Sequence, residues 1–389
     1  MRTIGVVTVA RSDYGHYLPL LRRINETDGL RLHLIAAGSH LASEFGSTVE
    51  LIEADGFEVA DRVEMLRSSD TPLGIARSMG LGVTGFAESF ARARPDILVL
   101  LGDRFEMHAA ALAALPFKIP VAHIHGGEIT RGAIDDSLRH SMTKLSHVHF
   151  VATEEYARRV IQLGEEPWRV LVTGGIGLDS VRSIALMDRA ELEAAVGLSL
   201  DEPTLLVTFH PVTLEYEDVD WQAGELLSAL GAAGLPVVFT APNADTGGRS
   251  VRALIEAFVQ SAPRSILVEN LGTRAFFSMM SVAAAMVGNS SSGIIEAPSF
   301  GLPVVNIGAR QEGRARAANV IDVGNGREEI LDGIRRALDP SFRESLRGMA
   351  NPYGAGGAAE LIVERLASID LDRELITKRF HDLGPDGAS

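Results

Sequence analysis

Short apolar runs rich in Val, Ile and Leu recur along the chain, and segments with a helical pattern separate them. Strands that are buried on both faces read as unbroken apolar runs, so this alternation predicts parallel sheets covered by helices on both sides. The runs are TIGVVTV, LHLIAAG, DILVLLG, IPVAHIH, VHFVAT and VLVTGG, followed by TLLVTFH, LPVVFTA, SILVEN, AAAMVGN and LPVVNIG. The pattern therefore predicts the α/β class, with two doubly wound, Rossmann-like units in succession.

A polar segment separates the two sets of runs. RAELEAAVGLSLDEP reads as a helix followed by a turn and Pro203, which suits a connection between domains better than a core. A chain of 389 residues is also long for one core. We expect an N-terminal domain over 1–175, a C-terminal domain over 176–370 and a separate tail over 371–389.

Polar residues follow the apolar runs in both halves. Ligands of open parallel sheets bind beyond the carboxyl ends of the strands, so these positions are candidates for a site. The residues are Arg11, Ser12 and Asp13; Asp103, Arg104 and Glu106; Gly126, Gly127 and Glu128; His210; Asn243 and Asp245; and Ser290, Ser291 and Ser292. Their recurrence predicts one cleft between two facing domains.

The stretch GNSSSGIIEAPSFG is the clearest local signal. Its serines stand where a helix is expected to begin, and the free N–H groups and positive dipole end of a first helical turn suit a phosphate. Glu296, further along that helix, could accept hydrogen bonds from ribose hydroxyls. The alternative is an ordinary serine cap with a solvated glutamate.

Two further motifs carry titratable side chains. HIHGGE holds His123, His125 and Glu128, but this set matches no closely spaced metal motif, so we expect no metal and interpret His123 as a core histidine. In DDSLRHSMTKLSH, Asp135 and Arg139 share one helical row. That row could be a solvated face with ordinary ion pairs, but the helix begins directly after HGGE and hence near the expected site.

Charge and composition narrow the class of protein. The net charge of −15 argues against broad binding of nucleic acid or anionic lipid, although a small anionic ligand is compatible with it. The chain has no Cys, which excludes disulfides and thiolate chemistry. No G-x-G-x-x-G follows the first run, and no segment has the apolar length to span a bilayer. We expect a cytoplasmic protein without a cofactor.

Taken in order, the motifs resemble those of the UDP-N-acetylglucosamine 2-epimerase family, in particular its hydrolysing branch. The resemblance runs over nearly the whole chain and is carried by RSDYG, GSHL, LGDRFE, HIHGGE, DDSLRHSMTKLSH, FHPVT, NADTGG, GNSSSGIIEAPSFG and GARQEGR. It implies a GT-B architecture, a nucleotide-sugar substrate, a homodimer or homotetramer, and a C-terminal tail that packs back on the first domain. The implied reaction converts UDP-N-acetylglucosamine and water to N-acetylmannosamine and UDP.

The resemblance also implies roles for individual residues. Acid, base and electrostatic roles fall to Asp103, His125, Glu128, Asp135, Asp136, Arg139 and His210. UDP would contact Arg11, Asp13, His210, Asn243, Asp245, Ser290, Ser291, Ser292, Glu296 and Arg310, and the sugar would contact His40 and Arg104. Many relatives carry Glu where this chain has His125, so either His125 or Glu128 takes the role of that glutamate.

Three alternatives stay open at the level of sequence. A hydrolysing epimerase for a UDP- or GDP-linked 2,4-diacetamido-trideoxy sugar, on the way to legionaminic acid, would differ only around C4 and C6 of the sugar. A GT-B glycosyltransferase shares the fold and the nucleotide site but needs an acceptor groove. A catalytically silent nucleotide-sugar sensor is disfavoured by the intact set of Asp103, Asp135, Asp136 and His210.

Overall fold

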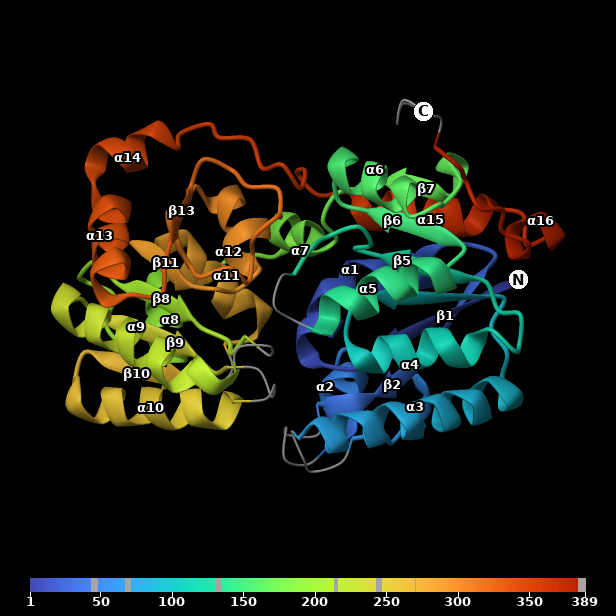
Figure 1. Cartoon of the computed structure of the whole chain (residues 1–389), viewed down its shortest axis with the longest axis horizontal. Helices are drawn as coiled ribbons and strands as arrows, with labels where there is room; N and C mark the ends of the chain where they lie inside the picture. The colour runs from blue at the N-terminus through green and yellow to red at the C-terminus, as the bar shows by residue number, and fades with distance from the viewer. Residues whose placement is uncertain are drawn as a thin grey trace. The chain divides into compact units, whose positions relative to one another are not determined.

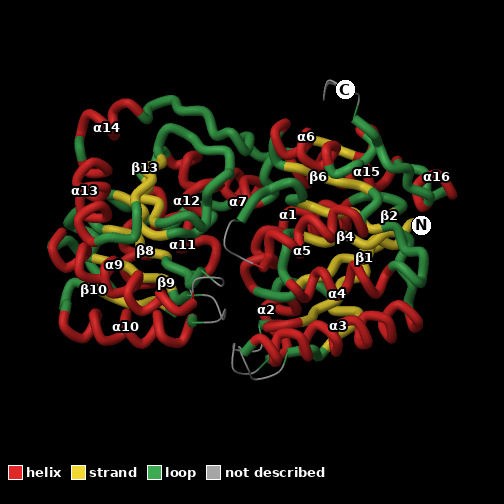
Figure 2. Tube along the Cα trace, in the orientation of Figure 1, coloured by secondary structure: helices red, strands yellow, loops and turns green. Residues whose placement is uncertain are grey.

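The structure is a computed structural model that describes residues 1–42, 48–66, 71–130, 134–212, 216–242, 247–269 and 271–383. The chain forms two compact units. Unit 1 comprises Met1–Glu128, Asp135–Ser180 and Gly356–Ser389, and unit 2 comprises Ile129–Ile134 and Val181–Ala355. In each unit, helices lie on both faces of a central sheet (Figures 1 and 2).

Unit 1 is built on a seven-stranded parallel sheet with the order β3-β2-β1-β4-β5-β6-β7. Its strands are β1 (Arg2–Thr8), β2 (Leu30–Ala37), β3 (Val59–Val63), β4 (Ile97–Leu101), β5 (Val121–Ile124), β6 (Val148–Val151) and β7 (Val170–Val172). Its helices are α1 (Arg11–Glu26), α2 (Val49–Ala54), α3 (Pro72–Arg92), α4 (Phe105–Ala114), α5 (Ile134–Leu145), α6 (Glu154–Gln162), α15 (Ala358–Ser368) and α16 (Arg373–Ile376), with the 3-10 turns η1 (Gly38–Leu41) and η3 (Pro167–Arg169).

The last part of the chain belongs to unit 1, because α15 packs beside α1. Asp179 fixes the beginning of α15: its carboxylate accepts hydrogen bonds from the N–H groups of Ala358 (3.0 Å) and Ala359 (2.6 Å). A carboxylate at this position satisfies donors that have no partner inside the helix. The unit therefore continues from Gly356, within the range that the sequence assigned to the C-terminal domain.

Unit 2 is built on a six-stranded parallel sheet with the order β10-β9-β8-β11-β12-β13. Its strands are β8 (Leu205–Thr208), β9 (Val237–Thr240), β10 (Ser265–Val268), β11 (Ala285–Gly288), β12 (Val304–Ile307) and β13 (Val320–Val323). Its helices are α8 (Arg189–Val196), α9 (Val219–Ala233), α10 (Gly248–Ser261), α11 (Gly272–Val282), α12 (Ser292–Ile295), α13 (Arg327–Leu338) and α14 (Pro340–Ser345), with η4 (Tyr216–Asp218) and η5 (Ala297–Phe300). Helix α7 (Gly177–Ser183) contains the boundary between the units.

The predicted α/β class with two Rossmann-like units is confirmed, and every apolar run named above contains a strand. The sequence missed β3 and β13. Both are edge strands, and each alternates buried with exposed positions instead of forming an apolar run. Short edge strands of this kind face water on one side, so their pattern is weak.

Strand order identifies where a ligand site is expected in each unit. The order reverses between β1 and β4 in unit 1 and between β8 and β11 in unit 2. At such a switch point the connections leave in opposite directions and open a crevice beyond the carboxyl ends of the strands. None of the helices in the described ranges combines the length and the apolar content that crossing a bilayer requires.

Candidate functional site

In unit 1, the ends of β4 and β5 bring titratable side chains together. The two strands are paired neighbours, so the segments after Leu101 and Ile124 leave the sheet side by side. Asp103 follows β4 and forms an ion pair with Arg139 of α5. The Arg139 side chain is only 3% exposed, so this pair stands in a much drier environment than a surface ion pair.

His125 follows β5 and lies against Glu128. Its Nδ1 is 2.9 Å from Oε1 of Glu128, whose side chain is 2% exposed. Nε2 of His125 is buried and has no hydrogen-bond partner among the described residues. His125 also has a φ of 68°, in the left-handed region that few residues other than Gly adopt. Backbone strain of this kind is concentrated at functional sites.

His16 of α1 is a member of this group that the sequence did not reveal. Burial lowers the pKa of His16 to about 4; the nearby His125 lowers it further, and Glu128 opposes both effects. The ring is therefore neutral near pH 7. His16 directly follows the quoted motif RSDYG, but only the fold connects it with the residues after β5.

The predicted core histidine, His123, is buried in β5. Its Nε2 lies 2.7 Å from the carbonyl oxygen of Gly102, which can only accept, so Nε2 carries the proton. Burial lowers the pKa of His123 to about 3. His123 thus joins the ends of β4 and β5 as a neutral hydrogen-bond donor.

The turn between β1 and α1 is held by Asp13. Its carboxylate accepts hydrogen bonds from Thr8 Oγ1 (2.7 Å) and from the N–H groups of Val9 (2.9 Å) and Ala10 (2.6 Å). Burial nevertheless raises the pKa of Asp13 to about 6. These contacts fix the backbone that presents Arg11, and the predicted contact of Asp13 itself with UDP would compete with them.

His40 lies behind the same turn and is fully buried. Its Nε2 is 2.9 Å from Thr8 Oγ1, and its Nδ1 is 2.7 Å from Thr48 Oγ1. Because the Thr8 hydroxyl donates to Asp13, it accepts from Nε2, and burial lowers the pKa of His40 to about 4. Both ring nitrogens are engaged within the protein, and the predicted sugar contact stays a prediction.

The remaining predicted residues of unit 1 lie on α5 and at the start of α4. Asp136 Oδ1 is 4.0 Å from Arg139 Nη1, and its Oδ2 is 3.6 Å from His140 Nε2. Arg104 lies 3.2 Å from the buried Glu106. Asp135 is partly exposed on the first turn of α5.

In unit 2, Asn289 joins the ends of β8 and β11. Its Oδ1 accepts from the N–H of His210, and its Nδ2 donates to the carbonyl oxygen of His210, both at 2.8 Å. Burial lowers the pKa of His210 to about 3, and the nearby Arg310 acts in the same direction. His210 is therefore held in place as a neutral ring, beside a cation.

Gly288 lets these two strand ends approach each other. Its φ is 137°, and a Cβ at this position would lie 2.0 Å from the carbonyl oxygen of Thr208. No side chain fits there. The glycine before the serines is thus required by the close approach of β8 and β11.

The loop after β12 closes on the same point. Arg310 Nη1 (3.1 Å) and Gln311 Nε2 (2.8 Å) both donate to the carbonyl oxygen of Asn289. Three partly buried serines follow Asn289 in the chain: Ser290, Ser291 and Ser292. The expected helix is a single turn, α12, and the buried Glu296 stands at its end.

The predicted residues of unit 2 fall into one group by two kinds of relation to Asn289: His210 and Arg310 contact it, and Ser290, Ser291, Ser292 and Glu296 follow it along the chain. Asn243 and Asp245 lie outside the described residues. The sequence missed Asn289 and Gln311 as members of the group, although both stand inside quoted motifs, GNSSSG and GARQEGR. Within the described ranges, no three or more His, Asp or Glu side chains are grouped so as to hold a metal ion.

Comparison with solved structures defines the class of fold. A Neisseria meningitidis UDP-GlcNAc 2-epimerase bound to UDP-GlcNAc matches with a TM-score of 0.82 at 20% identity, over 95% of this chain and 100% of that one. An S. aureus MnaA–UDP structure matches with a TM-score of 0.80 at 17% identity, over 94% and 96%. The fold is the GT-B type of two Rossmann-like units.

The family model described as UDP-N-acetylglucosamine 2-epimerase matches residues 22–367, and the chain belongs to this family. A UDP-N,N'-diacetylbacillosamine 2-epimerase (hydrolyzing) of Legionella pneumophila is 36% identical over 97% of this chain and 99% of its own length. A GDP/UDP-N,N'-diacetylbacillosamine 2-epimerase (hydrolyzing) of Campylobacter jejuni is 37% identical over 88% and 87%. The polysialic acid biosynthesis protein P7 of Escherichia coli is 35% identical over 98% of each.

Proposed function

We propose that this chain is a hydrolysing 2-epimerase that converts a UDP-linked 2-acetamido sugar and water into UDP and the free sugar inverted at C2. Two relatives above 35% identity carry the word hydrolyzing in their names, and they align with most of the chain. The proposal agrees with the site because inversion at C2 needs acid and base groups together with a cationic clamp for the leaving diphosphate.

The preferred sugar in this proposal is N,N'-diacetylbacillosamine, which carries acetamido groups at C2 and C4. UDP-N-acetylglucosamine, the substrate favoured by the motifs, is the second candidate. A Neisseria meningitidis UDP-N-acetylglucosamine 2-epimerase that is 32% identical over 98% of this chain supports it. The higher identity of the two bacillosamine enzymes supports the diacetamido sugar as the first candidate.

The reaction balances without an added redox group. A base removes the proton from C2 while the bond from C1 to the UDP oxygen breaks, which leaves a glycal with a double bond between C1 and C2. Water then adds its hydroxyl to C1. C2 receives a proton on the face opposite to the one from which the first proton was removed, so C2 is inverted. One water is consumed, and UDP and the free sugar are released.

The observation that carries the proposal is the contact between His125 and Glu128. The buried carboxylate lies 2.9 Å from Nδ1 of the ring, and Nε2, which has no hydrogen-bond partner among the described residues, is the atom that would exchange a proton. In this arrangement His125 takes the role of the usual family glutamate, and Glu128 orients it. Asp103, paired with Arg139, is the second acid or base, and Asp135 and Asp136 stand nearby on α5.

UDP is assigned to the group around Asn289. The Ser290 and Ser291 hydroxyls and the guanidinium of Arg310 supply donors for phosphate oxygens, and Glu296 supplies acceptors for ribose hydroxyls. His210 stays neutral in the bare protein, and a diphosphate beside it would raise its pKa and favour the charged ring. Arg11, partly buried after β1 in unit 1, stays a predicted phosphate contact.

Parallel assays test the function and the sugar. The protein is incubated with UDP-N,N'-diacetylbacillosamine and with UDP-N-acetylglucosamine, and released UDP and free sugar are quantified. We expect equal amounts of UDP and free 2-epimer, with the higher kcat/KM for the diacetamido sugar. A UDP-linked 2-epimer as the lasting product would contradict hydrolysis, and transfer to an added sugar acceptor would indicate a glycosyltransferase.

A further inference from the structure

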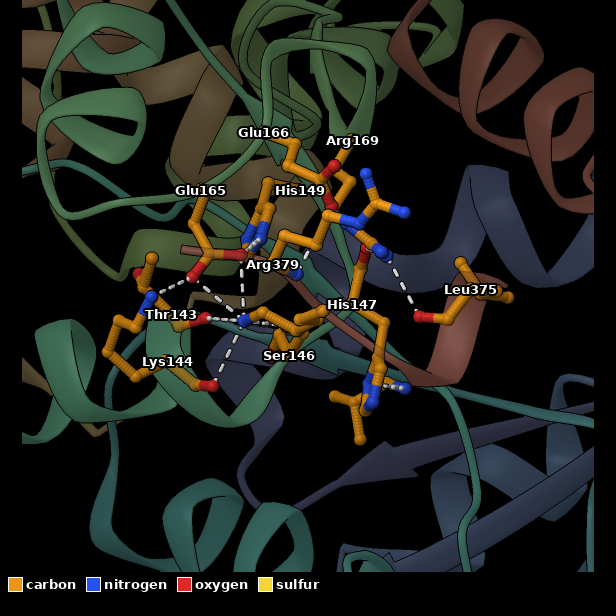
Figure 3. A network of polar contacts seen from close by, with 12 residues as sticks. Thr143, Lys144, Ser146, His147, His149, Glu165, Glu166, Arg169, Leu375 and Arg379 are labelled. Atoms are coloured by element: carbon orange, nitrogen blue, oxygen red, sulfur yellow. Dashed lines mark hydrogen bonds and ion pairs between the residues drawn. The ribbon is translucent and has the colours of Figure 1, made fainter. Parts of the chain in front are cut away.

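Helix α5 carries part of the proposed catalytic group in its first turns, and its far end is closed by a residue from the end of the chain. The last carbonyl groups of an α-helix have no partners inside the helix. Lys378 follows α16, and its Nζ donates to the carbonyl oxygens of Thr143 (3.4 Å), Lys144 (3.0 Å) and Ser146 (2.6 Å). Figure 3 labels these three acceptor residues within the polar network around Glu165. A cation at this position also complements the negative end of the helix dipole.

Glu165 is the counter-charge of Lys378. Its side chain is fully buried, and Lys378 Nζ lies 2.8 Å from Oε1 and 2.7 Å from Oε2. Lys144 Nζ (2.5 Å) and His149 Nε2 (3.0 Å) also contact this carboxylate. Glu165 therefore keeps two protein partners when Lys378 is replaced, so a substitution of Lys378 does not leave a buried carboxylate alone.

The segment that carries Lys378 is itself anchored. The fully buried Arg169 donates to the carbonyl oxygens of Glu374 and Leu375, both at 2.8 Å. On the other side of Lys378, the N–H of His381 donates to the carbonyl oxygen of Gly164 at 2.9 Å. Both sides of the lysine are thus fixed to unit 1, and its position against α5 is determined.

The capped end is one turn from the proposed site. Thr143, whose carbonyl Lys378 contacts, donates its hydroxyl to the carbonyl oxygen of Arg139 at 3.2 Å. Arg139 in turn pairs with Asp103 at the end of β4. A movement of the C-terminal turn of α5 would therefore reach the Asp103–Arg139 pair through a short, buried path.

We propose that Lys378 is a positioning residue, which fixes the C-terminal end of α5 and thereby the geometry of Arg139 and Asp103. This inference rests on the proposed function, since it assigns a catalytic consequence to that pair. Small displacements of reacting groups are costly in rate, and about 1 Å can reduce turnover by about a hundred-fold. Such a displacement acts on the chemical step, whereas UDP is assigned to unit 2.

The test compares Lys378→Met with Arg379→Met, a control that removes the neighbouring exposed cation. Amide hydrogen exchange of α5 is measured on both proteins without substrate, and kcat, KM and the Kd for UDP are then measured. For Lys378→Met we expect faster exchange over 134–145, kcat lower by about ten-fold to about a hundred-fold, and KM and Kd within about two-fold of wild type. Arg379→Met should match wild type in all four.

Lys378→Gln is the second variant, for the case that the methionine prevents folding. It keeps two N–H donors but no charge, and we expect kcat between those of wild type and Lys378→Met. Unchanged exchange of α5 in both Lys378 variants would overturn the cap. Faster exchange with unchanged kcat would overturn the link to Arg139. Wild-type protein without turnover on any nucleotide sugar would refute the proposed function, and with it the catalytic consequence, while the exchange data would still decide the cap.

Discussion

Gly288→Ala tests whether the close approach of β8 and β11 holds together the group around Asn289, to which UDP is proposed to bind. Two costs follow from this single methyl group. The φ of 137° belongs to a region that only Gly populates readily, which costs an L-residue about 1 to 3 kcal/mol. The new Cβ would also lie 2.0 Å from the carbonyl oxygen of Thr208, far inside ordinary contact distance.

Relief of that overlap requires the two strands to separate by more than about 1 Å, since ordinary contacts begin near about 3.5 Å. This separation breaks the hydrogen bond from Asn289 N to Thr208 O, which is 3.2 Å long, and strains the neighbouring hydrogen bonds between β8 and β11. Each buried backbone bond lost costs about 1 to 3 kcal/mol. We therefore expect Gly288→Ala to destabilise unit 2 by about 2 to 6 kcal/mol.

Gly301→Ala is the matched control in the same unit. Gly301 also has a positive φ, 59°, but a Cβ there would meet nothing within 4 Å. It therefore isolates the conformational cost, which is about 1 kcal/mol. The difference between the two variants, at least about 1 kcal/mol, reports the overlap with Thr208 together with any extra conformational cost of the φ of 137° over that of 59°.

Urea unfolding followed by tryptophan fluorescence provides the assay. The chain has two tryptophans, Trp168 in unit 1 and Trp221 in unit 2, so a Trp168→Phe background makes the signal specific for unit 2. Calorimetry with UDP is run on the same proteins under native conditions. Equal shifts of the urea midpoint for Gly288→Ala and Gly301→Ala, with intact UDP binding, would refute the described approach of the strands.

Three further outcomes are expected. Glu296→Ala should weaken UDP binding in calorimetry. Asp103→Asn should keep UDP affinity within a few-fold and lower kcat by about a hundred-fold. Loss of UDP binding by a folded Asp103→Asn would instead indicate that Asp103 contacts the nucleotide. Burial alone would raise the pKa of Glu165, but His149 and the two lysines lower it to about 2. The stability that this carboxylate contributes is then complete above pH 4.5 and is lost as the pH falls toward 2. Between pH 5 and 3 the urea midpoint of Glu165→Gln should therefore depend less on pH than that of wild type. An equal dependence of the midpoint on pH in both proteins would contradict this prediction. Activity should survive treatment with EDTA, because guanidinium groups can neutralise the diphosphate. Activity that is lost with EDTA and restored only by a divalent metal would show that the reaction needs a metal ion.

The sequence predicts most of the fold because buried parallel strands leave a strong signal. The run DILVLLG is apolar at every inner position, LPVVNIG has one polar inner residue, Asn306, and each contains a strand. The edge strands β3 and β13 were missed because their outer faces need no apolar residue. The helix expected after the serines is a single turn, α12, and a 3-10 turn that contains Pro298 and ends at Gly301 follows it.

The candidate site was predictable only in part. Residues inside motifs, such as Asp103 and Glu128, can be found from the position of strand ends. His16 and Lys378 could not be found in this way, because each reaches its partners through the fold: His16 only borders the motif RSDYG, and Lys378 stands in none. Asn289 differs again: it stands in a quoted motif, but its two hydrogen bonds to the His210 backbone depend on the approach allowed by Gly288.

The most direct test of the central claim is the reaction in heavy water, followed by NMR with UDP-N,N'-diacetylbacillosamine and, in parallel, with UDP-N-acetylglucosamine. Elimination and rehydration take the new hydrogen at C2 from solvent. We predict free UDP together with a free sugar of inverted configuration that carries deuterium at C2. A released sugar that keeps its original hydrogen at C2, or a 2-epimer that remains linked to UDP, would contradict the account.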